Sequence, residues 1–472
     1  MSDCPKDDFD GKAALAVARA APRRQLSLFD STCIIVGIIV GAGIYCASPN
    51  VAQNAPNAWT LLGLWIFGGI LSLVGALCYA ELATMYPREG GDYVYLTRAF
   101  GRTTGFLFAW SQLWVVRPGS IGAMAYAFAE YANQIWPRAE GDRAVYVLAA
   151  YASGSILLFT GVNMLGVREG KWTQNALTVV KLLGLATIVV VGLSCVRSAT
   201  PAIEPHASKG WAEWGRLGAA MIFILFTFGG WNEMAYVGAE VRNPRKNILR
   251  ALLIGTLAVT AVYALVNAAF LHALGFEGLR GGDAPAADVL ELGVGRWAGQ
   301  FVSLLIAVSA LGAINGQIFT GSRIYYAMGT EHRMYAWLGR WNARRGGPIR
   351  SLAIQGAITL VLTVWFGLSR NGFSRMVIFT TPVFWLFLVM VGASVYVLRR
   401  REPNQERPFR TPGYPITPAV FCLSSASLVG ASLDYALRNS SWEALWAIAI
   451  LAVGVVVAVS QRNDKKPIDG AS

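Results

Sequence analysis

Two glycine-interrupted apolar segments hold the residues that could bind a polar ligand inside a membrane. Residues 36–49 read VGIIVGAGIYCASP, and residues 223–233 read FILFTFGGWNE. Glycine weakens a helix and lets the backbone take conformations that alanine cannot, so both segments can unwind. Unwound backbone in a bilayer is tolerated only where protein or a water-filled cavity covers it. The segments therefore predict a polar binding site, although close helix packing through small residues would explain either one alone.

The backbone groups freed by these interruptions have opposite polarity. Amide groups near Gly41–Gly43 begin a half-helix, where the helix dipole favours a carboxylate. Carbonyl groups near Phe226–Phe228 end a half-helix and can accept hydrogen bonds from an ammonium group. A zwitterionic amino acid would satisfy both ends. We therefore predict a substrate site formed at the two interruptions by Ile39, Val40, Gly41, Ala42, Gly43, Ile44, Phe226, Thr227, Phe228, Gly229, Gly230 and Glu233.

Three charged side chains lie within apolar segments. Lys181 is nearly centred in LTVVKLLGLATIVVV, and such a lysine is a functional candidate unless its long side chain reaches the interface. Glu233 follows the second interruption by about one turn. It is predicted to be proton-linked, to contact a basic substrate, or to pair with a fixed internal cation. Arg117 precedes Pro118 at a predicted kink, where its guanidinium is expected to take up freed carbonyls in a structural role.

The elements that position these residues are predicted from the lengths of the apolar runs. The chain has 472 residues, of which 55% are apolar and 14% charged. This composition, with its recurring apolar runs, predicts an all-α polytopic membrane protein. We expect twelve membrane helices, at residues 31–48, 59–86, 103–135, 144–163, 173–195, 215–240, 249–274, 297–329, 349–367, 375–398, 415–437 and 441–460.

The interruptions occupy matching places in two predicted repeats. The first helix of residues 29–200 and the first helix of residues 201–402 each contain one. Five helices per repeat is an odd number, so the second repeat enters the membrane from the opposite side, as an inverted repeat requires. The pairing favours a binding site over chance packing. Two further helices are expected in residues 403–461, and cytoplasmic tails at residues 1–28 and 462–472.

The predicted topology explains the excess of basic over acidic residues in the chain. The net charge is +13, and 27 of the 40 Lys and Arg residues fall on the side of the termini. This asymmetry predicts that both termini are cytoplasmic and explains the charge without nucleic acid. The six cysteines have no metal-type spacing, so we expect neither a metal, a cofactor nor a disulfide framework. Residues 1–28 lack the apolar stretch of a signal peptide.

Several segments, taken together, resemble a known transporter family. They are VGIIVGAGIYCASP, YAELATMYPREGGDYVYL (79–96), RPGSIGAMAYAFAEY (117–131), FTFGGWN with AEVRNPRKNI, and GAINGQIFTGSRIYYAMGTEHRMYAWL (312–338). The pattern is similar to the amino acid–polyamine–organocation superfamily, in particular its L-type amino acid transporter branch. The resemblance implies the LeuT-type fold of five plus five inverted helices and sodium-independent transport or exchange of amino acids.

The resemblance also implies roles for particular residues. The Gly41–Gly43 amides would hold the substrate carboxylate, and Phe226 would occupy an aromatic gate position. Lys181 would take the place of a sodium ion, and we expect it to reach carbonyls in 37–40 and a hydroxyl such as that of Ser309. Eukaryotic L-type subunits carry a cysteine between helices 3 and 4 for a heavy-chain disulfide. The corresponding loop, 136–143, has none, so no disulfide-linked heavy chain is expected.

Other function classes fit the sequence less well. A channel needs rings of polar or charged residues along a continuous pore. A membrane enzyme is disfavoured because His206, His272 and His332 are scattered and no HExxH or nucleophile motif occurs. The resemblance also implies that Phe384 belongs to the substrate site, because relatives often place a polar residue beside the substrate side chain in this part of the tenth predicted helix. Phe384 and Trp385 at that place favour neutral amino acids as substrates of a carrier in the cytoplasmic (inner) membrane. Cationic amino acids, polyamines or a transporter-shaped sensor are the alternatives.

Overall fold

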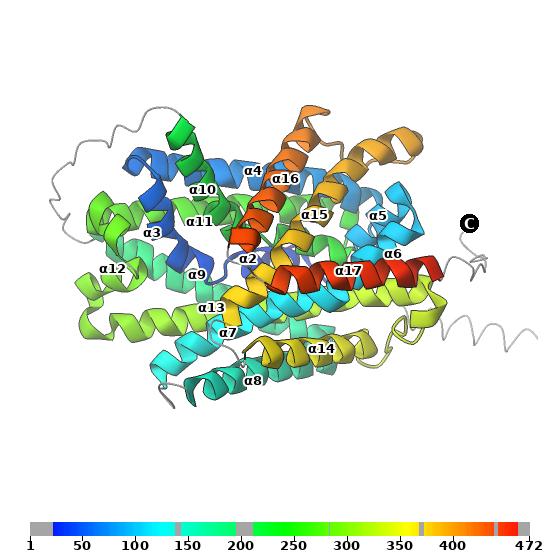
Figure 1. Cartoon of the computed structure of the whole chain (residues 1–472), viewed down its shortest axis with the longest axis horizontal. Coiled ribbons are helices and arrows are strands. Elements are labelled where there is room, and N and C mark those ends of the chain that lie inside the picture. Colours follow the sequence, from blue (N-terminus) through cyan, green and yellow to red (C-terminus); the bar gives the residue numbers. More distant parts are fainter. Residues whose placement is uncertain are drawn as a thin grey trace, which may run out of the picture.

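The computed structural model describes residues 22–136, 143–194, 211–282, 284–367, 372–438 and 442–460. Within these ranges the chain forms helices joined by short connections, with isolated β-bridges and no named strand. Most of the long helices lie side by side along one axis, and two helices near the C-terminus cross them obliquely (Figure 1). Most of both predicted tails, and residues 137–142 of the cysteine-free loop, lie outside the described residues. The all-α polytopic fold is confirmed.

Ten helical spans in the described residues are long and apolar enough to cross a membrane. They are α4 (Ala58–Met85), α8 (Ala144–Leu165), α9 (Val167–Ser194), the span Gly215–Tyr236 that contains most of α10 (Trp211–Thr227), α11 (Pro244–Gly281), α13 (Ala298–Glu331), α14 (Ile349–Gly367), α15 (Gly372–Arg401), α16 (Ile416–Arg438) and α17 (Trp442–Ser460). The bent pair α2 (Leu28–Ile39) and α3 (Gly43–Asn54) makes an eleventh if it is counted as one span.

The predicted count of twelve spans is not confirmed, because the third predicted helix is divided. It consists of α6 (Arg102–Ser111), a π-helical turn η1 (Gln112–Val116) and α7 (Arg117–Ile135). Pro118 has no backbone N–H and would clash with the preceding turn of a regular helix. The wider π-helical turn lies just before Pro118 and accommodates it.

Two short helices were not predicted from the sequence. They are α5 (Asp92–Phe100) and α12 (Pro285–Val294), and both are too short to span a bilayer. Gly90 and Gly91 precede α5 with φ of 86° and 41°, which is a left-handed conformation that glycine adopts without strain. The turn directs α5 back against α6 and α15, so its first residues are buried.

Both predicted interruptions are real breaks in the helices. α2 ends at Ile39 and α3 begins at Gly43, with a bend of 49° between them. α10 ends at Thr227, and the chain continues through Gly230, whose φ is 116°, into a 3-10 segment. The two breaks approach each other closely, since a Cβ placed on Gly43 would lie only 3.0 Å from the Thr227 hydroxyl.

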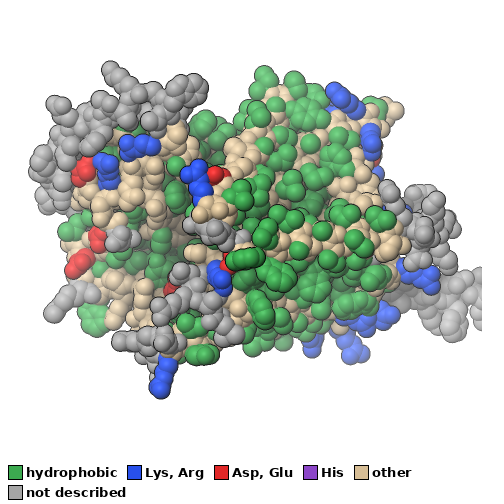
Figure 2. Space-filling model, viewed as in Figure 1, with side chains coloured by type: hydrophobic (Ala, Val, Ile, Leu, Met, Phe, Trp, Pro, Cys, Tyr) green, Lys and Arg blue, Asp and Glu red, His purple; other side chains and the backbone are tan. Residues whose placement is uncertain are grey.

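The outer surface matches a protein surrounded by lipid. Hydrophobic side chains cover much of the face formed by α15, α16 and α17, while Lys and Arg side chains gather along the right-hand end (Figure 2). That end contains the start of α6 and the connection between α13 and α14 (Figure 1). A broad apolar face bordered by charged ends is expected of a membrane-spanning helical bundle.

Buried ion pairs join the helices at this charged end. Arg323 of α13 and Glu240 lie 2.7 Å apart, with side chains 1% and 0% exposed. Glu240 belongs to the segment that follows the second break, and its backbone oxygen also accepts hydrogen bonds from the amides of Gln25 and Leu26 ahead of α2. The pair therefore connects α13 to the chain segments of both broken helices.

Glu240→Gln should destabilise the protein strongly. Removing one partner of a buried pair leaves an uncompensated charge, which costs about 3–5 kcal/mol. We expect a melting temperature several degrees lower in a detergent thermal-unfolding assay.

Glu406→Gln is the matched control, because Glu406 pairs with Arg245 while both side chains are more than 60% exposed. Exposed pairs contribute only about 0–1 kcal/mol, so the control should melt close to wild type. Equal melting temperatures for the two variants would contradict the assignment.

Candidate functional site

A cavity of about 150 Å³ lies where the two helix breaks meet α7, α13 and α15. The structure brings most of the predicted substrate residues to its wall, namely Ile39, Gly41, Ala42, Gly43, Phe226, Thr227, Gly229, Gly230, Glu233 and Phe384. Residues from Ile39 to Phe384, far apart in the sequence, thus surround one space.

Three predicted residues do not line the cavity. The side chains of Val40 and Ile44 are fully buried in the core. Phe228 packs its ring against Tyr263 and Trp65, with centroids 5.0 and 6.2 Å away. Successive residues around a helix end point in different directions, so a contiguous stretch of sequence does not face one cavity throughout.

The aromatic residues beside the breaks have different surroundings. Phe226 lines the cavity and is 43% exposed. Trp231 packs against Tyr79 and Phe421 at centroid distances of 5.1 and 5.8 Å, and Tyr45 is buried. Of these aromatic residues beside the breaks, Phe226, the predicted gate residue, is therefore the one placed to contact a ligand in this cavity.

The amide end of the first break lies one residue later than the sequence predicted. The Gly41 amide donates to the Ile39 carbonyl at 2.8 Å and is already bonded. Within the described residues, the amides of Ala42, Gly43 and Ile44 have no backbone acceptor. They form the positive end of α3, where an anion is favoured.

The carbonyl end of the second break retains acceptor capacity. The Phe226 carbonyl accepts from the Gly229 amide at 3.1 Å. The Tyr263 hydroxyl lies 3.3 Å from the Thr227 carbonyl and 3.1 Å from the Ile39 carbonyl, so it can donate to either break. Each carbonyl oxygen has two lone pairs. The Phe226 and Thr227 carbonyls can therefore also accept hydrogen bonds from a ligand ammonium group.

Lys181 of α9 is fully buried and reaches the first break. Its Nζ donates to the carbonyls of Gly37 at 2.7 Å, Val40 at 2.8 Å and Ser309 at 3.0 Å. The sequence analysis expected contacts with the carbonyls of 37–40 and with a hydroxyl such as that of Ser309, which lies on α13. The contact on α13 is instead the Ser309 carbonyl, because the Ser309 hydroxyl itself donates to Val40 at 3.1 Å. All three ammonium protons are thus used.

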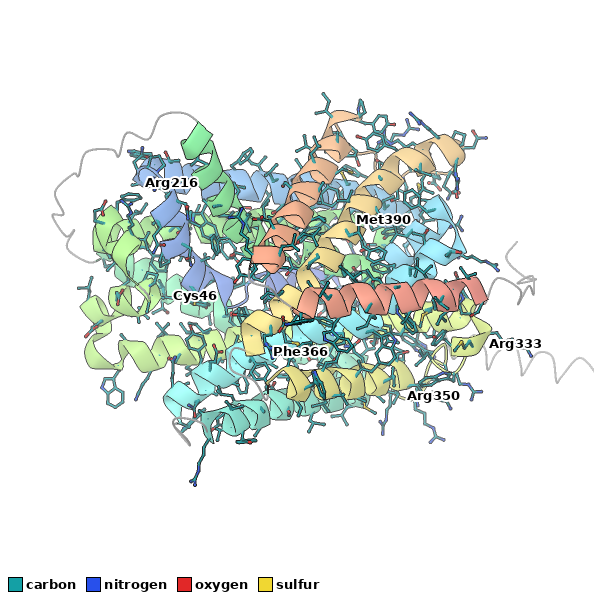
Figure 3. The ribbon with its side chains drawn as sticks, viewed as in Figure 1. Cys46, Arg216, Arg333, Arg350, Phe366 and Met390 are labelled. Carbon is teal, nitrogen blue, oxygen red and sulfur yellow. The ribbon has the colours of Figure 1, made fainter. Side chains whose placement is uncertain are left out.

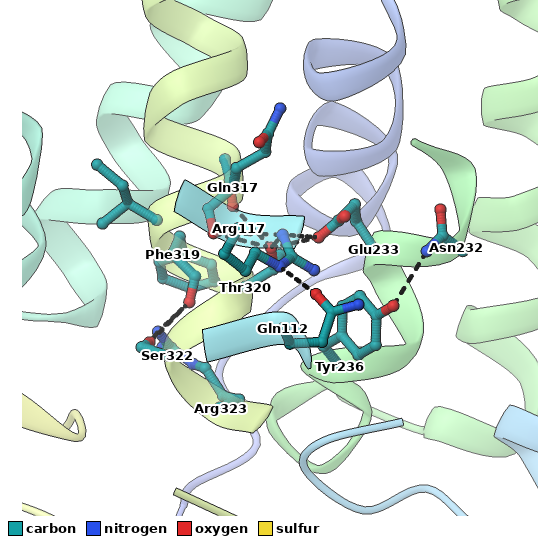
Figure 4. Close-up of polar contacts among 12 residues, drawn as sticks. Gln112, Arg117, Asn232, Glu233, Tyr236, Gln317, Phe319, Thr320, Ser322 and Arg323 are labelled. Atoms are coloured by element: carbon teal, nitrogen blue, oxygen red, sulfur yellow. Dashed lines mark hydrogen bonds and ion pairs between the residues drawn. The ribbon is translucent and has the colours of Figure 1, made fainter. Parts of the chain in front are cut away.

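Arg117 and Glu233 form an ion pair at the cavity wall (Figure 4). Arg117 Nη1 lies 2.8 Å from Glu233 Oε2, which also accepts from the Thr320 hydroxyl at 2.5 Å. Arg117 Nε donates to the Gln112 side chain, and the guanidinium lies 5.0 Å from the Tyr236 ring centre. The guanidinium contacts chiefly side chains and not the carbonyls freed by the kink, so that expected contact is wrong, while the structural role of Arg117 stays a prediction. Glu233 has an internal cation as its partner.

A polar network continues from the cavity to Asp92 at the start of α5. Asn232 donates to the Tyr236 hydroxyl at 3.1 Å, and Tyr236 and Tyr79 both donate to Asp92 Oδ2 at 2.8 Å. Burial raises the pKa of Asp92 to about 7, although the two hydroxyls oppose this shift. The carboxyl therefore changes charge near neutral pH.

The sequence prediction missed most of the walls formed by α7 and α15, on which Phe384 was the predicted site residue. The additional lining residues on these helices are Gly119, Ser120, Ala123, Met124, Met376, Val377, Thr380, Thr381 and Trp385. The small residues in RPGSIGAM recur at helical spacing and could have indicated an open helix face. Apart from Phe384 and Trp385, nothing in the sequence alone indicated which side chains of α15 point inward.

Two helix breaks face each other around a cavity, and the buried Lys181 of α9 donates to carbonyls of the first break. This arrangement is that of a membrane carrier with broken helices rather than an enzyme. A profile of the amino acid permease family matches residues 26–458. The chain belongs to this family, which lies within the amino acid–polyamine–organocation superfamily, and the resemblance to that superfamily is confirmed.

The chain is also similar to individual amino acid transporters. It is 30% identical to the b(0,+)-type amino acid transporter 1 of Mus musculus over 92% of this chain and 87% of the relative. It is 32% identical to the large neutral amino acids transporter small subunit 2 of Homo sapiens over 86% of this chain and 75% of the relative. Amino acid transport is thereby supported as its activity.

Asp92→Asn should remove a pH dependence of stability. Because burial raises the Asp92 pKa to about 7, the native state keeps a proton that the unfolded carboxyl loses near pH 4. Wild-type stability should therefore fall as pH rises from about 4.5 to 7, by up to about 1.4 kcal/mol per pH unit, and then level off. In melting curves recorded between pH 5 and 8, the melting temperature should fall less for Asp92→Asn than for wild type.

Asp434→Asn is a suitable control, because Asp434 pairs with Arg438 on the exposed surface. Its pH profile should match that of wild type. A wild-type profile retained by Asp92→Asn would show that Asp92 does not titrate in this range.

Proposed function

We propose that this protein is a sodium-independent secondary transporter of neutral amino acids in the cytoplasmic membrane, working by alternating access. Exchange or proton-linked uptake would drive it. The observation that carries this proposal is Lys181, whose ammonium lies among carbonyls of Gly37, Val40 and Ser309. Carbonyl and hydroxyl oxygens are suitable ligands for a metal cation in a broken-helix carrier. A fixed ammonium in their midst supports operation without sodium.

The substrate backbone would bind between the two breaks. The free amides at the start of α3 suit the carboxylate, and the carbonyls at the end of α10 suit the ammonium group. Phe226 and Phe384 would cover the side chain. These groups recognise what all amino acids share, so the rest of the cavity must select among them.

The Arg117–Glu233 pair supports neutral substrates over cationic ones. Glu233 Oε2 already accepts from Arg117 and Thr320, and the opposite charges of the pair cancel. A cationic side chain would have to displace a buried guanidinium from its carboxylate, which is costly. The names of the relatives include both b(0,+)-type and large neutral amino acid transporters.

The proposal also includes the sidedness of the termini and the absence of a heavy-chain partner. Both termini would be cytoplasmic, because the basic residues concentrate on their side. Loop 136–143 has no cysteine for a disulfide-linked heavy chain, so the protein would work without one.

Counterflow in proteoliposomes tests the proposed function. Wild type should accumulate labelled neutral amino acids against unlabelled internal ones, equally in sodium and in choline. Lys181→Ala should lower the rate at least tenfold, because three buried carbonyls lose their donor. Lys246→Ala, at an exposed position, is the control and should transport normally. Wild-type rates in Lys181→Ala, or sodium dependence of wild type, would contradict the proposal; binding without accumulation would indicate a sensor.

Substitutions in the ion pair test the substrate class. Wild type should exclude lysine. Arg117→Gln leaves the Glu233 carboxylate unpaired in the cavity. We expect lysine transport, measured relative to transport of neutral substrates, to rise about tenfold. A new charge pair that contributes about 1.4 kcal/mol corresponds to that factor. The double variant Arg117→Gln/Glu233→Gln restores neutrality and should exclude lysine again. Lysine transport by wild type would contradict the neutral class.

A further inference from the structure

A second cavity, of about 330 Å³, lies at the charged end of the bundle. It has more than twice the volume of the cavity between the helix breaks. Three separate chain segments form it: residues 23–25 ahead of α2, the turn 165–169 between α8 and α9, and residues 341–346 between α13 and α14. Figure 3 shows Arg333 and Arg350, which flank the last segment, at this same end.

Four arginines and one glutamate line this cavity. They are Arg23, Arg168, Arg344, Arg345 and Glu169. Within the described residues, none of the four guanidinium groups forms an ion pair. Arg345 Nη1 donates to the Met164 carbonyl at 3.1 Å. The lining therefore carries a net charge of about three positive units, and nothing in the described chain neutralises it.

Hydrogen bonds hold the backbone of these segments in place. Lys171 donates to the Gln25 carbonyl at 3.2 Å and pairs with Asp30 of α2 at 3.0 Å. The Asn342 side chain accepts from the amides of Arg344 and Arg345, both at 3.0 Å. The bases of the arginines are thus fixed before any ligand binds, which lowers the entropic cost of binding.

The surroundings place the cavity at the level of lipid headgroups. Leu165 ends the membrane helix α8, lines the cavity, and is 61% exposed. Trp172, near the start of membrane helix α9, is 63% exposed. Exposed tryptophan at the end of a membrane helix is typical of the boundary between lipid and water. An acyl chain could lie on the exposed apolar surface beside Leu165 while a headgroup enters the cavity.

We propose that this cavity binds the phosphate headgroup of an anionic phospholipid from the cytoplasmic leaflet. Guanidinium groups match phosphate oxygens through paired hydrogen bonds, and basic cavities between membrane helices on this side suit such headgroups. Arginines that only follow the positive-inside rule and face water would explain the positive charge. They would not explain why arginines from three chain segments line one cavity. Because one segment leads into α2, an occupied site would hold the base of the first broken helix against α9 and α13.

The test compares lipid retention by two variants with the same loss of charge. Arg168→Gln/Arg344→Gln removes two cavity arginines, both on exposed positions. Arg333→Gln/Arg340→Gln removes two exposed arginines at the same end that do not line the cavity. Each full-length protein is delipidated, supplied with phosphatidylglycerol or phosphatidylcholine, and measured by native mass spectrometry and thermal unfolding.

We expect wild type and the control variant to retain phosphatidylglycerol and to melt at a higher temperature with it than with phosphatidylcholine. The cavity variant should bind phosphatidylglycerol at least tenfold more weakly and lose that shift. Equal retention by both variants, or equal loss, would overturn the proposal. Inorganic phosphate and glycerol 3-phosphate should leave the melting temperature unchanged; a shift as large as that with lipid would overturn the lipid assignment in favour of a free anion.

Discussion

The structure depends on satisfying backbone groups that a broken helix leaves unpaired away from water. The break after Ile39 frees carbonyls in a low-dielectric interior, where an unpaired polar group costs several kcal/mol, that is roughly 2–7 kcal/mol. Lys181 offsets this cost, because its ammonium donates hydrogen bonds to carbonyls on both sides of the interface between α2 and α13. The carbonyls in turn compensate for the burial of the ammonium. Neither the break nor the buried lysine is tolerable without the other.

The same requirement extends to the cavity wall. Arg117 and Glu233 are each expensive to bury, and together they are neutral and hydrogen-bonded by Gln112 and Thr320. The ring of Tyr236 packs against the Arg117 guanidinium, and its hydroxyl donates a hydrogen bond to Asp92. A cavity wall built in this way is polar without net charge. Such a wall suits the zwitterionic substrate proposed above, whose charges the two helix breaks would meet.

Charge is arranged differently at the end of the bundle that holds Arg323 and the second cavity. Glu240 and Arg323 form an enclosed pair that connects α13 to segments of both broken helices. The arginines of the second cavity are exposed and unpaired within the described residues. Enclosed pairs fix the helices relative to one another, whereas convergent unpaired cations leave room for an anion. One end of the bundle thus combines structural pairing with a surface suited to lipid.

The sequence by itself determined the helical class, both breaks and the location of Lys181, because run length, glycine and an isolated charge are local signals. It predicted that the breaks face one site, and the structure brings most of those residues together. Local signals did not determine the partner of Glu233, the position of Phe228, or most of the walls from α7 and α15. Those depend on the rotation and packing of helices distant in sequence, which only the tertiary structure decided.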